Sequence, residues 1–240
     1  MNGCNNQTFE TYMVSSSNRL AFRAAESAAE HPGEKFTPLC LFGAGGLGKT
    51  HLLRAVHERI RKQDADAVIC TFTAEEFSGA LLKAIQDGKT ERLRAQLKQT
   101  DALLIDDLQY LAGKTQTQKE FLRVLNDAAE EGCQVVMASS VPPKELRVLT
   151  EGLAGSEKAL MADIRIPEPG ESLGFVRQAA ERYGMTLPEE TLEQIAERAG
   201  GDYRRIIGIL TRMQAETELS NPPVEQGSGI QRETTERQNR

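Results

Sequence analysis

The sequence has no tryptophan, and aromatic residues make up only 5% of its 240 positions. Its four cysteines stand far apart, without a C-x-x-C pair or a neighbouring histidine, which argues against a disulfide scaffold or a zinc site. No apolar run reaches the length of about 18 residues expected of a membrane span, and the first residues lack the apolar core of a signal peptide. These absences favour a soluble, cytoplasmic protein without a membrane partner.

Positive charge is not in excess either. The chain carries 29 Lys and Arg against 35 Asp and Glu, a formal net charge of −6, so it is not expected to coat duplex DNA by bulk charge. Glycine and proline are at ordinary levels, which excludes collagen-like repeats and wholesale disorder. The length fits one large domain, or one domain with a small second one.

Apolar runs of strand type alternate with segments of helical period, which predicts an α/β fold with a parallel sheet covered by helices. The predicted strands are residues 39–42, 68–72, 102–105, 134–138 and 162–166. Helices are predicted at residues 17–30, after the glycine-rich turn that follows the first strand, and between the third and fourth strands.

Composition changes at Pro167–Gly170, and beyond it only helical periods occur. Three successive segments there each have apolar residues on one helical face, which predicts three helices. A capping box at residues 186–189 is predicted to start the middle helix. We therefore expect a nucleotide-binding core over residues 1–166 and a small unit of three helices over 167–220. Residues 221–240 are polar and aperiodic, which predicts a disordered tail.

The segment after the first strand fits G-x-x-x-x-G-K-[ST], the pattern of a phosphate-binding loop. Its residues are Gly43, Ala44, Gly45, Gly46, Leu47, Gly48, Lys49 and Thr50. Glycines let backbone N–H groups converge on a phosphate, and the following helix adds the positive end of its dipole. Lys49 is expected to reach the β- and γ-phosphates, and the Thr50 hydroxyl suits Mg²⁺. A chance glycine-rich turn is the alternative, which the position between a strand and a helix disfavours.

Two acids, Asp106 and Asp107, end the third predicted strand. Ligands of parallel sheets bind at the carboxyl edge, where both acids are expected to lie. Asp106 is predicted to hold Mg²⁺, and Asp107 to polarise the water that attacks the γ-phosphate. A solvated turn is the alternative for two acids after a strand, and the phosphate loop favours the functional interpretation.

Arg204 lies in the first turn of the last predicted helix, where Asp202 is the expected N-cap. A cation there opposes the helix dipole by about 0.3–1 kcal/mol, which an anionic ligand would offset. An ion pair with Asp202 or a neighbouring acid is the alternative. The histidines have no metal-binding spacing, and the ring of His51 is interpreted as part of a helix surface rather than as a catalytic group.

Several segments of the chain resemble the ATPase domain of the bacterial replication initiator DnaA, of the AAA+ class. These segments are TFE and SNRLA near the start, then GLGKTHLLRAV, DALLIDDLQYLAGKTQTQKEF and PPKEL. The resemblance covers about residues 8–215. It implies a P-loop NTPase with a five-stranded parallel sheet and a helical lid, which binds ATP or ADP with Mg²⁺ and acts in replication initiation or its regulation.

The family's nucleotide-contacting positions carry over residue by residue. Beyond the loop they are His51 directly after it, the metal-binding Asp106, the water-activating Asp107, Ser140 at sensor I, the lid arginine Arg204, and Val14 and Ser15 near the adenine.

The sequence departs from the family where neighbouring subunits meet. The family's D-R-L-x-S-R-F stretch, whose last arginine completes a neighbour's ATP site, corresponds to EGLAGSE at residues 151–157, with Lys158 as the nearest cation. Because such an arginine stabilises charge in the transition state, its absence predicts weak or partner-dependent hydrolysis. Of two basic positions that bind single-stranded DNA in the family, Lys114 is kept and Gln116 replaces the other.

Nucleic-acid and protein partners follow from the same resemblance. We expect at most a weak contact with single-stranded DNA, and no sequence-specific duplex binding, because residues 221–240 stand where the family has its helix-turn-helix domain. Three hypotheses stay open: a weak ATPase that docks on a replication initiator or another AAA+ protein, a non-hydrolysing ATP-dependent switch, and a helicase-loader-like ATPase.

Overall fold

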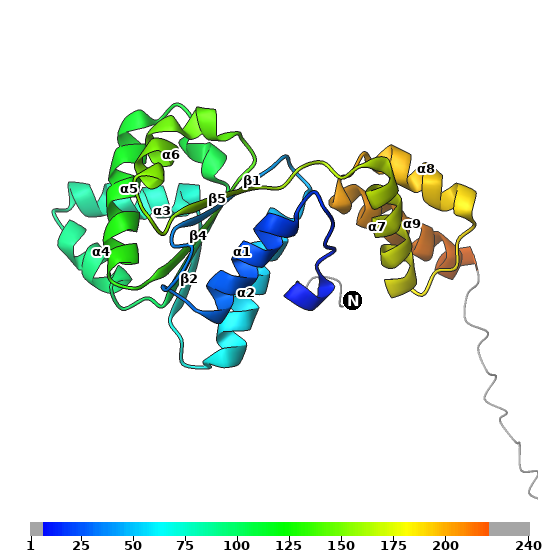
Figure 1. The fold of residues 1–240 in the computed structure, drawn as a ribbon, viewed down its shortest axis with the longest axis horizontal. Helices are drawn as coiled ribbons and strands as arrows, with labels where there is room; N and C mark the ends of the chain where they lie inside the picture. Colours follow the sequence, from blue (N-terminus) through cyan, green and yellow to red (C-terminus); the bar gives the residue numbers. More distant parts are fainter. Residues whose placement is uncertain (1–6, 221–240) are drawn as a thin grey trace, which may run out of the picture.

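The structure is a computed structural model that describes residues 7–220, so the tail predicted at 221–240 lies outside the described residues. Its centre is an all-parallel, five-stranded sheet in the order β2-β3-β4-β1-β5 (Figure 1). The strands are β1 (Leu39–Phe42), β2 (Ile69–Thr73), β3 (Ala102–Asp106), β4 (Gln134–Ser139) and β5 (Leu160–Asp163). The predicted α/β class and the parallel sheet are therefore confirmed.

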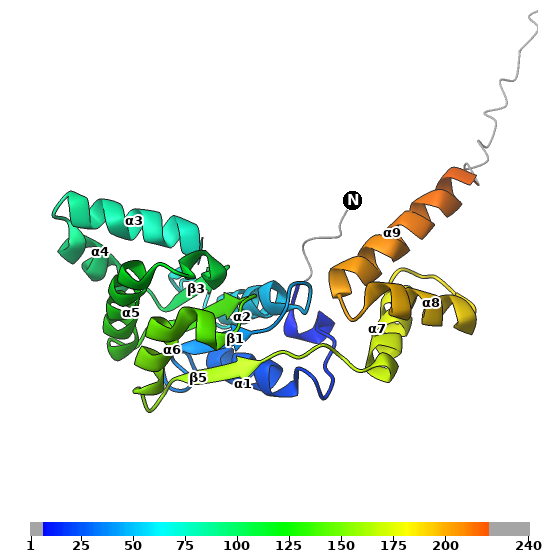
Figure 2. The same cartoon turned by 90° about the horizontal axis from the view of Figure 1, so that it is seen from above.

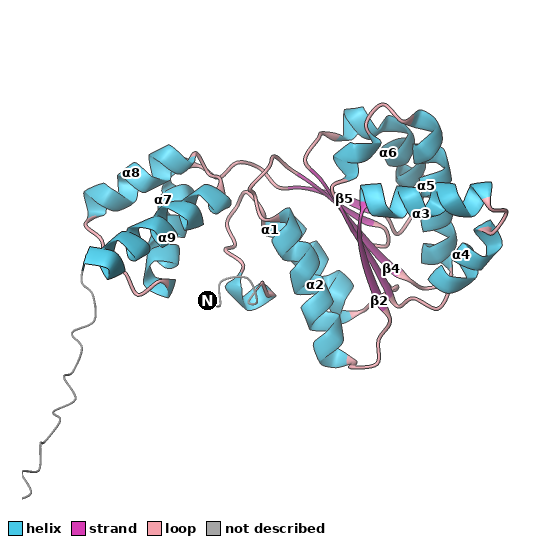
Figure 3. Cartoon of the chain, turned by 180° about the vertical axis from the view of Figure 1, so that it is seen from behind, coloured by secondary structure: helices cyan, strands magenta, loops and turns pink. Residues whose placement is uncertain are grey.

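Helices cover both faces of the sheet (Figure 3). One face carries α1 (Arg19–Glu30) and α2 (Lys49–Gln63); the other carries α3 (Ala74–Gln86), α5 (Thr115–Glu130) and α6 (Arg147–Ala154), with α4 (Thr90–Leu97) beside α3 and α5. Neighbouring strand residues serve opposite faces, so Leu104 packs in the α1–α2 cluster and Ile105 in the other. Such double coverage explains why the strands read as continuous apolar runs.

Short 3₁₀ turns lead into or out of these elements: η1 (Phe9–Thr11), η2 (Leu108–Leu111) and η3 (Pro143–Leu146). Within residues 7–220, no helix is long and apolar enough to cross a bilayer.

Three further helices form a separate helical unit beside the sheet (Figure 2). They are α7 (Pro169–Arg182), α8 (Glu189–Ala199) and α9 (Tyr203–Ser220). The helical unit has its own apolar cluster, built around Val176, Ile195, Ile206 and Leu210. Met13, from the other end of the chain, packs into the same cluster. The helical unit is therefore held to the sheet part both by the chain that follows β5 and by the N-terminal segment.

Two predicted boundaries are wrong for identifiable reasons. β5 is Leu160–Asp163 rather than residues 162–166, because the backbone N–H of Arg165 donates to Ser17 O (3.0 Å) instead of continuing the ladder. The middle helix of the helical unit begins at Glu189 without the predicted capping box, and Pro188 is its N-cap. The capping box would make Leu187 the first helical residue. Leu187 precedes a proline, and helical backbone is disfavoured at such a position, so the helix begins later.

Candidate functional site

The phosphate loop lies between the end of β1 and the start of α2, at the carboxyl edge of the sheet. Gly46 and Gly48 have φ values of +80° and +91°, in the left-handed region that favours glycine. Neither position has room for a side chain. A Cβ on Gly46 would overlap the Asp202 carboxylate, and one on Gly48 would stand 2.8 Å from the Tyr12 ring. Both glycines are thus required by backbone conformation and by close packing.

Lys49 is the first residue of α2, and only 7% of it is exposed. Its Nζ donates to the carbonyls of Gly43 (2.6 Å) and Ala44 (2.7 Å), within the loop itself. Burial lowers the pKa of Lys49; the charge of Asp106 opposes this shift and that of Arg204 adds to it. A phosphate would be a stronger partner than two neutral carbonyls for this partly desolvated ammonium.

Asp106, at the end of β3, is connected to the phosphate loop by a hydrogen bond from Thr50, at the start of α2. Its Oδ2 accepts a hydrogen bond from Thr50 Oγ1 (2.6 Å), and its Oδ1 accepts one from the Asp107 N–H (2.8 Å). In the described part of the chain, no group of three or more His, Cys, Asp or Glu side chains could hold a metal. The adjacent hydroxyl and carboxylate are nonetheless hard oxygen donors of the kind that Mg²⁺ prefers, and Thr50 and Asp106 would hold the ion beside the loop.

Asp107 adopts a left-handed backbone with φ +58°, which for a non-glycine residue costs on the order of 1 kcal/mol. Its side chain is oriented by Gln109, whose Nε2 donates to Asp107 Oδ1 (2.6 Å). The Oε1 of the same Gln109 accepts from the backbone N–H of Ser140 (3.1 Å), just beyond β4. Gln109 therefore links Asp107 to Ser140, two residues that were predicted at the site. Sequence reasoning missed it, and the only signal was its place two residues after the acid pair.

The start of α9 brings Arg204 to the phosphate loop. Asp202 Oδ1 accepts from the backbone N–H groups of Arg204 (2.8 Å) and Arg205 (3.3 Å), so the predicted N-cap is confirmed. The Tyr203 N–H donates to the carbonyl of Gly46 (3.1 Å), which fixes the helix on the loop. Arg204 Nη2 reaches within 3.4 Å of the point where a Cβ would stand on Gly45. The guanidinium thus lies over the loop, while the ion pair of Asp202 is with Arg205 (3.9 Å).

His51 is buried rather than on a helix surface, so that interpretation of its ring is wrong. Its Nε2–H donates to the Thr8 carbonyl (2.9 Å), and the Tyr12 ring meets its ring edge-on at 5.1 Å. The segment around residues 8–18, the N-terminal strap, covers it. Burial lowers the pKa of His51, and although the Thr8 carbonyl opposes this shift, the nearby charge of Arg182 adds to it.

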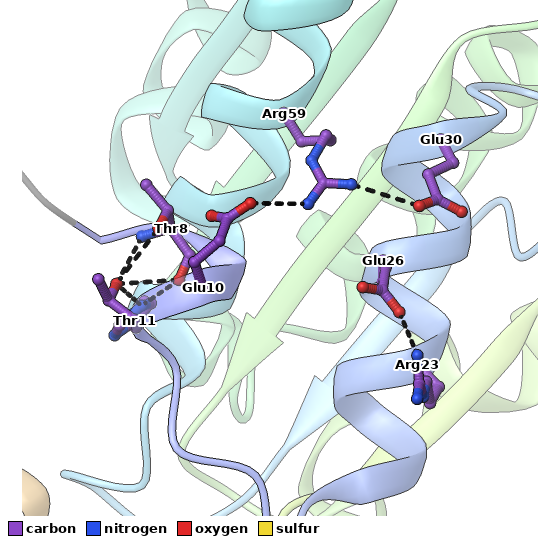
Figure 4. A network of polar contacts seen from close by, with 8 residues as sticks. Thr8, Glu10, Thr11, Arg23, Glu26, Glu30 and Arg59 are labelled. Carbon is purple, nitrogen blue, oxygen red and sulfur yellow. Dashed lines mark hydrogen bonds and ion pairs between the residues drawn. The ribbon is translucent and has the colours of Figure 1, made fainter. Parts of the chain in front are cut away.

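The N-terminal strap is anchored on both parts of the molecule. On the sheet side, Arg59 of α2 pairs with Glu10 (3.1 Å) and with Glu30 of α1 (3.3 Å; Figure 4). On the other side, Arg182 of α7 donates to the Thr11 carbonyl (2.6 Å). The strap therefore connects the helix that follows the phosphate loop with the helical unit.

A cleft lies where the strap, the loop and the helical unit meet. Its walls include Tyr12, Met13, Gly48, Ile164, Phe175 and Tyr203. Of the two residues predicted near the adenine, Val14 is 44% exposed, and neither it nor Ser15 lines the cleft. The strap instead turns Tyr12 and Met13 toward the cleft. The cleft is mostly apolar and opens beside the loop.

Two basic residues singled out in the sequence lie elsewhere. Lys158 Nζ donates to the Gly33 carbonyl (3.5 Å), in the loop that precedes β1, at the opposite edge of the sheet from the phosphate loop. Lys114 is exposed, and its Nζ lies 3.1 Å from the centre of the Tyr110 ring, a cation–π contact.

Comparison with known proteins agrees with this geometry. The profile of the bacterial DnaA ATPase domain matches residues 4–159. The chromosomal replication initiator protein DnaA of Deinococcus radiodurans is 37% identical over 217 residues, which are 90% of this chain and 47% of that protein. The chain thus spans about half the length of the curated relatives it matches.

Solved structures give the same result. Domain III of the Thermotoga maritima replication initiation protein DnaA superposes with a TM-score of 0.77 at 31% identity, covering 91% of this chain and 92% of that one. A replication initiator DnaA bound to AMPPCP and single-stranded DNA gives 0.76 at 25% identity, covering 89% and 67%. The chain belongs to the family of the bacterial DnaA ATPase domain.

Proposed function

We propose that this chain binds ATP with Mg²⁺ at the phosphate loop and acts in the initiation of DNA replication or in its regulation. The main support is the convergence of Lys49, Asp106 and Arg204 on one loop from three distant parts of the sequence. A DnaA neighbour bound to the ATP analogue AMPPCP lends further support.

In this proposal residues 1–166 form the nucleotide-binding core, and residues 167–220 form the lid. The loop N–H groups and Lys49 bind the phosphates, Arg204 contacts the γ-phosphate from the helical unit, and the cleft beside Tyr12 takes the adenine. Thr50 and Asp106 hold Mg²⁺, which when bound offsets phosphate charge. ADP would occupy the same site without the contact of Arg204.

Hydrolysis is proposed to be weak or dependent on a partner. Asp107, held by Gln109, would take the proton of a water directed at the γ-phosphate. The family's finger arginine has no counterpart at residues 151–157, and Glu151 instead pairs with Arg147 (3.1 Å). Lys158, the nearest cation, donates to the Gly33 carbonyl of the same chain (3.5 Å). A replication initiator or another AAA+ protein is the proposed source of the missing cation.

The test compares Asp107→Asn with the wild-type protein for ATP binding and for turnover, with and without a purified DnaA. We expect the variant to bind ATP as the wild type does and to lose at least about 100-fold of the turnover, as expected for loss of a general base. Asp87→Asn, at the end of α3, is the matched control. Binding without turnover in any wild-type mixture would favour the non-hydrolysing switch instead.

A contact with single-stranded DNA is a second candidate. It is favoured by the exposed Lys114, held over Tyr110, and by a DnaA neighbour whose structure includes single-stranded DNA. With one cation instead of the expected two, we propose that this contact is weak and strongly salt-dependent. A helicase-loader-like activity would instead require strong retention of single strands.

A further inference from the structure

Asp202 places a carboxylate directly against the phosphate loop. Gly46 is buried, and any Cβ there would overlap both carboxylate oxygens of Asp202. This contact joins the first turn of α9 to the middle of the loop, although the two residues are far apart in the sequence. A fixed negative charge therefore touches the segment that the proposed function assigns to the phosphates of ATP.

The position of this carboxylate is determined by the fold. Its Oδ1 accepts two backbone N–H groups of α9, from Arg204 and Arg205, and the Arg205 guanidinium approaches Oδ2 (3.9 Å). The neighbouring Tyr203 N–H is bonded to the Gly46 carbonyl. Asp202 cannot turn away from the loop without uncapping the helix or lifting its start from Gly46.

Two opposite charges of α9 therefore act on the same loop. Arg204 lies over Gly45, where its charge would attract a phosphate chain, whereas Asp202 lies against Gly46, where its charge would repel one. Like charges repel, so the Asp202 carboxylate opposes a phosphate bound at this loop, and the repulsion grows with each phosphate charge.

We propose that Asp202 is a specificity-determining residue, which lowers the affinity of the loop for nucleotides in proportion to their phosphate charge. The inference rests on the proposed function and deepens it. Arg204 alone would favour every phosphorylated nucleotide, whereas the pair of charges favours the ligand that reaches Arg204. Asp202 thereby weakens the binding of both ADP and ATP, and only ATP, whose γ-phosphate reaches Arg204, recovers the loss.

The test is Asp202→Asn, with Asp202→Ser as a second variant. Asparagine and serine are N-caps as good as aspartate, so α9 is retained while the charge is removed. Glu193→Gln on α8 gives the same change of net charge away from the loop. Affinities for ATP, ADP and adenosine are measured by calorimetry with saturating Mg²⁺, at low and at high salt.

Both Asp202 variants should bind ADP more tightly than the wild type at low salt, and ATP, which has one more phosphate, should gain more, about fivefold, which corresponds to about 1 kcal/mol. Their affinity for adenosine should equal that of the wild type, because adenosine has no phosphate. The gain should shrink in high salt, which screens charges at the surface. Glu193→Gln should leave all affinities within twofold of the wild type, on the order of the screened effect of a distant surface charge.

The alternatives are distinguishable in the same experiment. If the wild-type protein gives no heat with ATP, the proposed function fails and this inference falls with it. If the wild type binds ATP but the Asp202 variants bind it equally or more weakly, the inference alone is overturned. An equal gain for adenosine would also overturn it, because it would show that the carboxylate acts by packing rather than by charge.

Discussion

Replacing Lys49 with alanine should abolish the stabilisation that ATP gives to the protein. Bound ligand raises the free energy of unfolding by RT ln(1 + [L]/Kd), about 2.7 kcal/mol at a hundredfold excess of ATP over Kd. For a chain of this size, 1 kcal/mol shifts the melting temperature by about 2–4 °C, so the wild-type shift should be about 5–11 °C.

The loss in the variant can be estimated from the bonds that Lys49 would make. Hydrogen bonds to charged groups contribute about 1.5–3 kcal/mol each, so losing contacts with two phosphates weakens binding by about 3–6 kcal/mol. This is about a hundredfold or more in Kd. At the same ATP concentration the gain in stability then falls to about 0.4 kcal/mol or less, and the shift to under about 2 °C.

Without nucleotide, the same substitution should change the melting temperature little. The carbonyls of Gly43 and Ala44 lose their donor, but both residues are at least partly exposed and water can replace the ammonium. Removing a charge that burial disfavours offsets part of the lost packing. Lys62→Ala, at the exposed end of the same helix, should keep the full ATP shift. An undiminished shift in Lys49→Ala would refute the assignment of the loop.

Two further predictions concern the strap and the nucleic-acid contact. Because burial holds the pKa of His51 below its usual 6.5, the unfolded chain binds a proton that the folded protein does not, and stability should fall as the pH drops below that value. Thermal melts from about pH 7.5 to about pH 5 should show a flatter decline for His51→Gln than for the wild type or His57→Gln; identical curves would contradict the burial argument. Lys114→Ala should weaken retention of single-stranded DNA several-fold at low salt and flatten its salt dependence, whereas Lys119→Ala on the exposed side of α5 should do neither.

The sheet and the phosphate loop could be predicted from the sequence because their signals are local. Strands buried on both faces are short apolar runs, and the loop is defined by eight consecutive residues, Gly43–Thr50. Helices α3, α4 and α6 were not predicted, although α3 has a capping box, Thr73 with Glu76, that could have revealed it. α4 and α6 have only eight residues each, too few for a clear helical period.

The remainder of the site depends on contacts between residues that are distant in the sequence. Helical period places His51 on a helix but does not show that the N-terminal strap covers it. The left-handed Gly46 fits the loop pattern, but the sequence does not reveal that Asp202, more than 150 residues later, fills the space of its missing side chain. The family resemblance identified Arg204 because the arginine is part of a shared motif. It did not identify Asp202 or Gln109, whose importance lies in the hydrogen bonds and charges of this particular chain. Substitutions at these two positions therefore test the structure itself, whereas substitutions in the loop test only the motif.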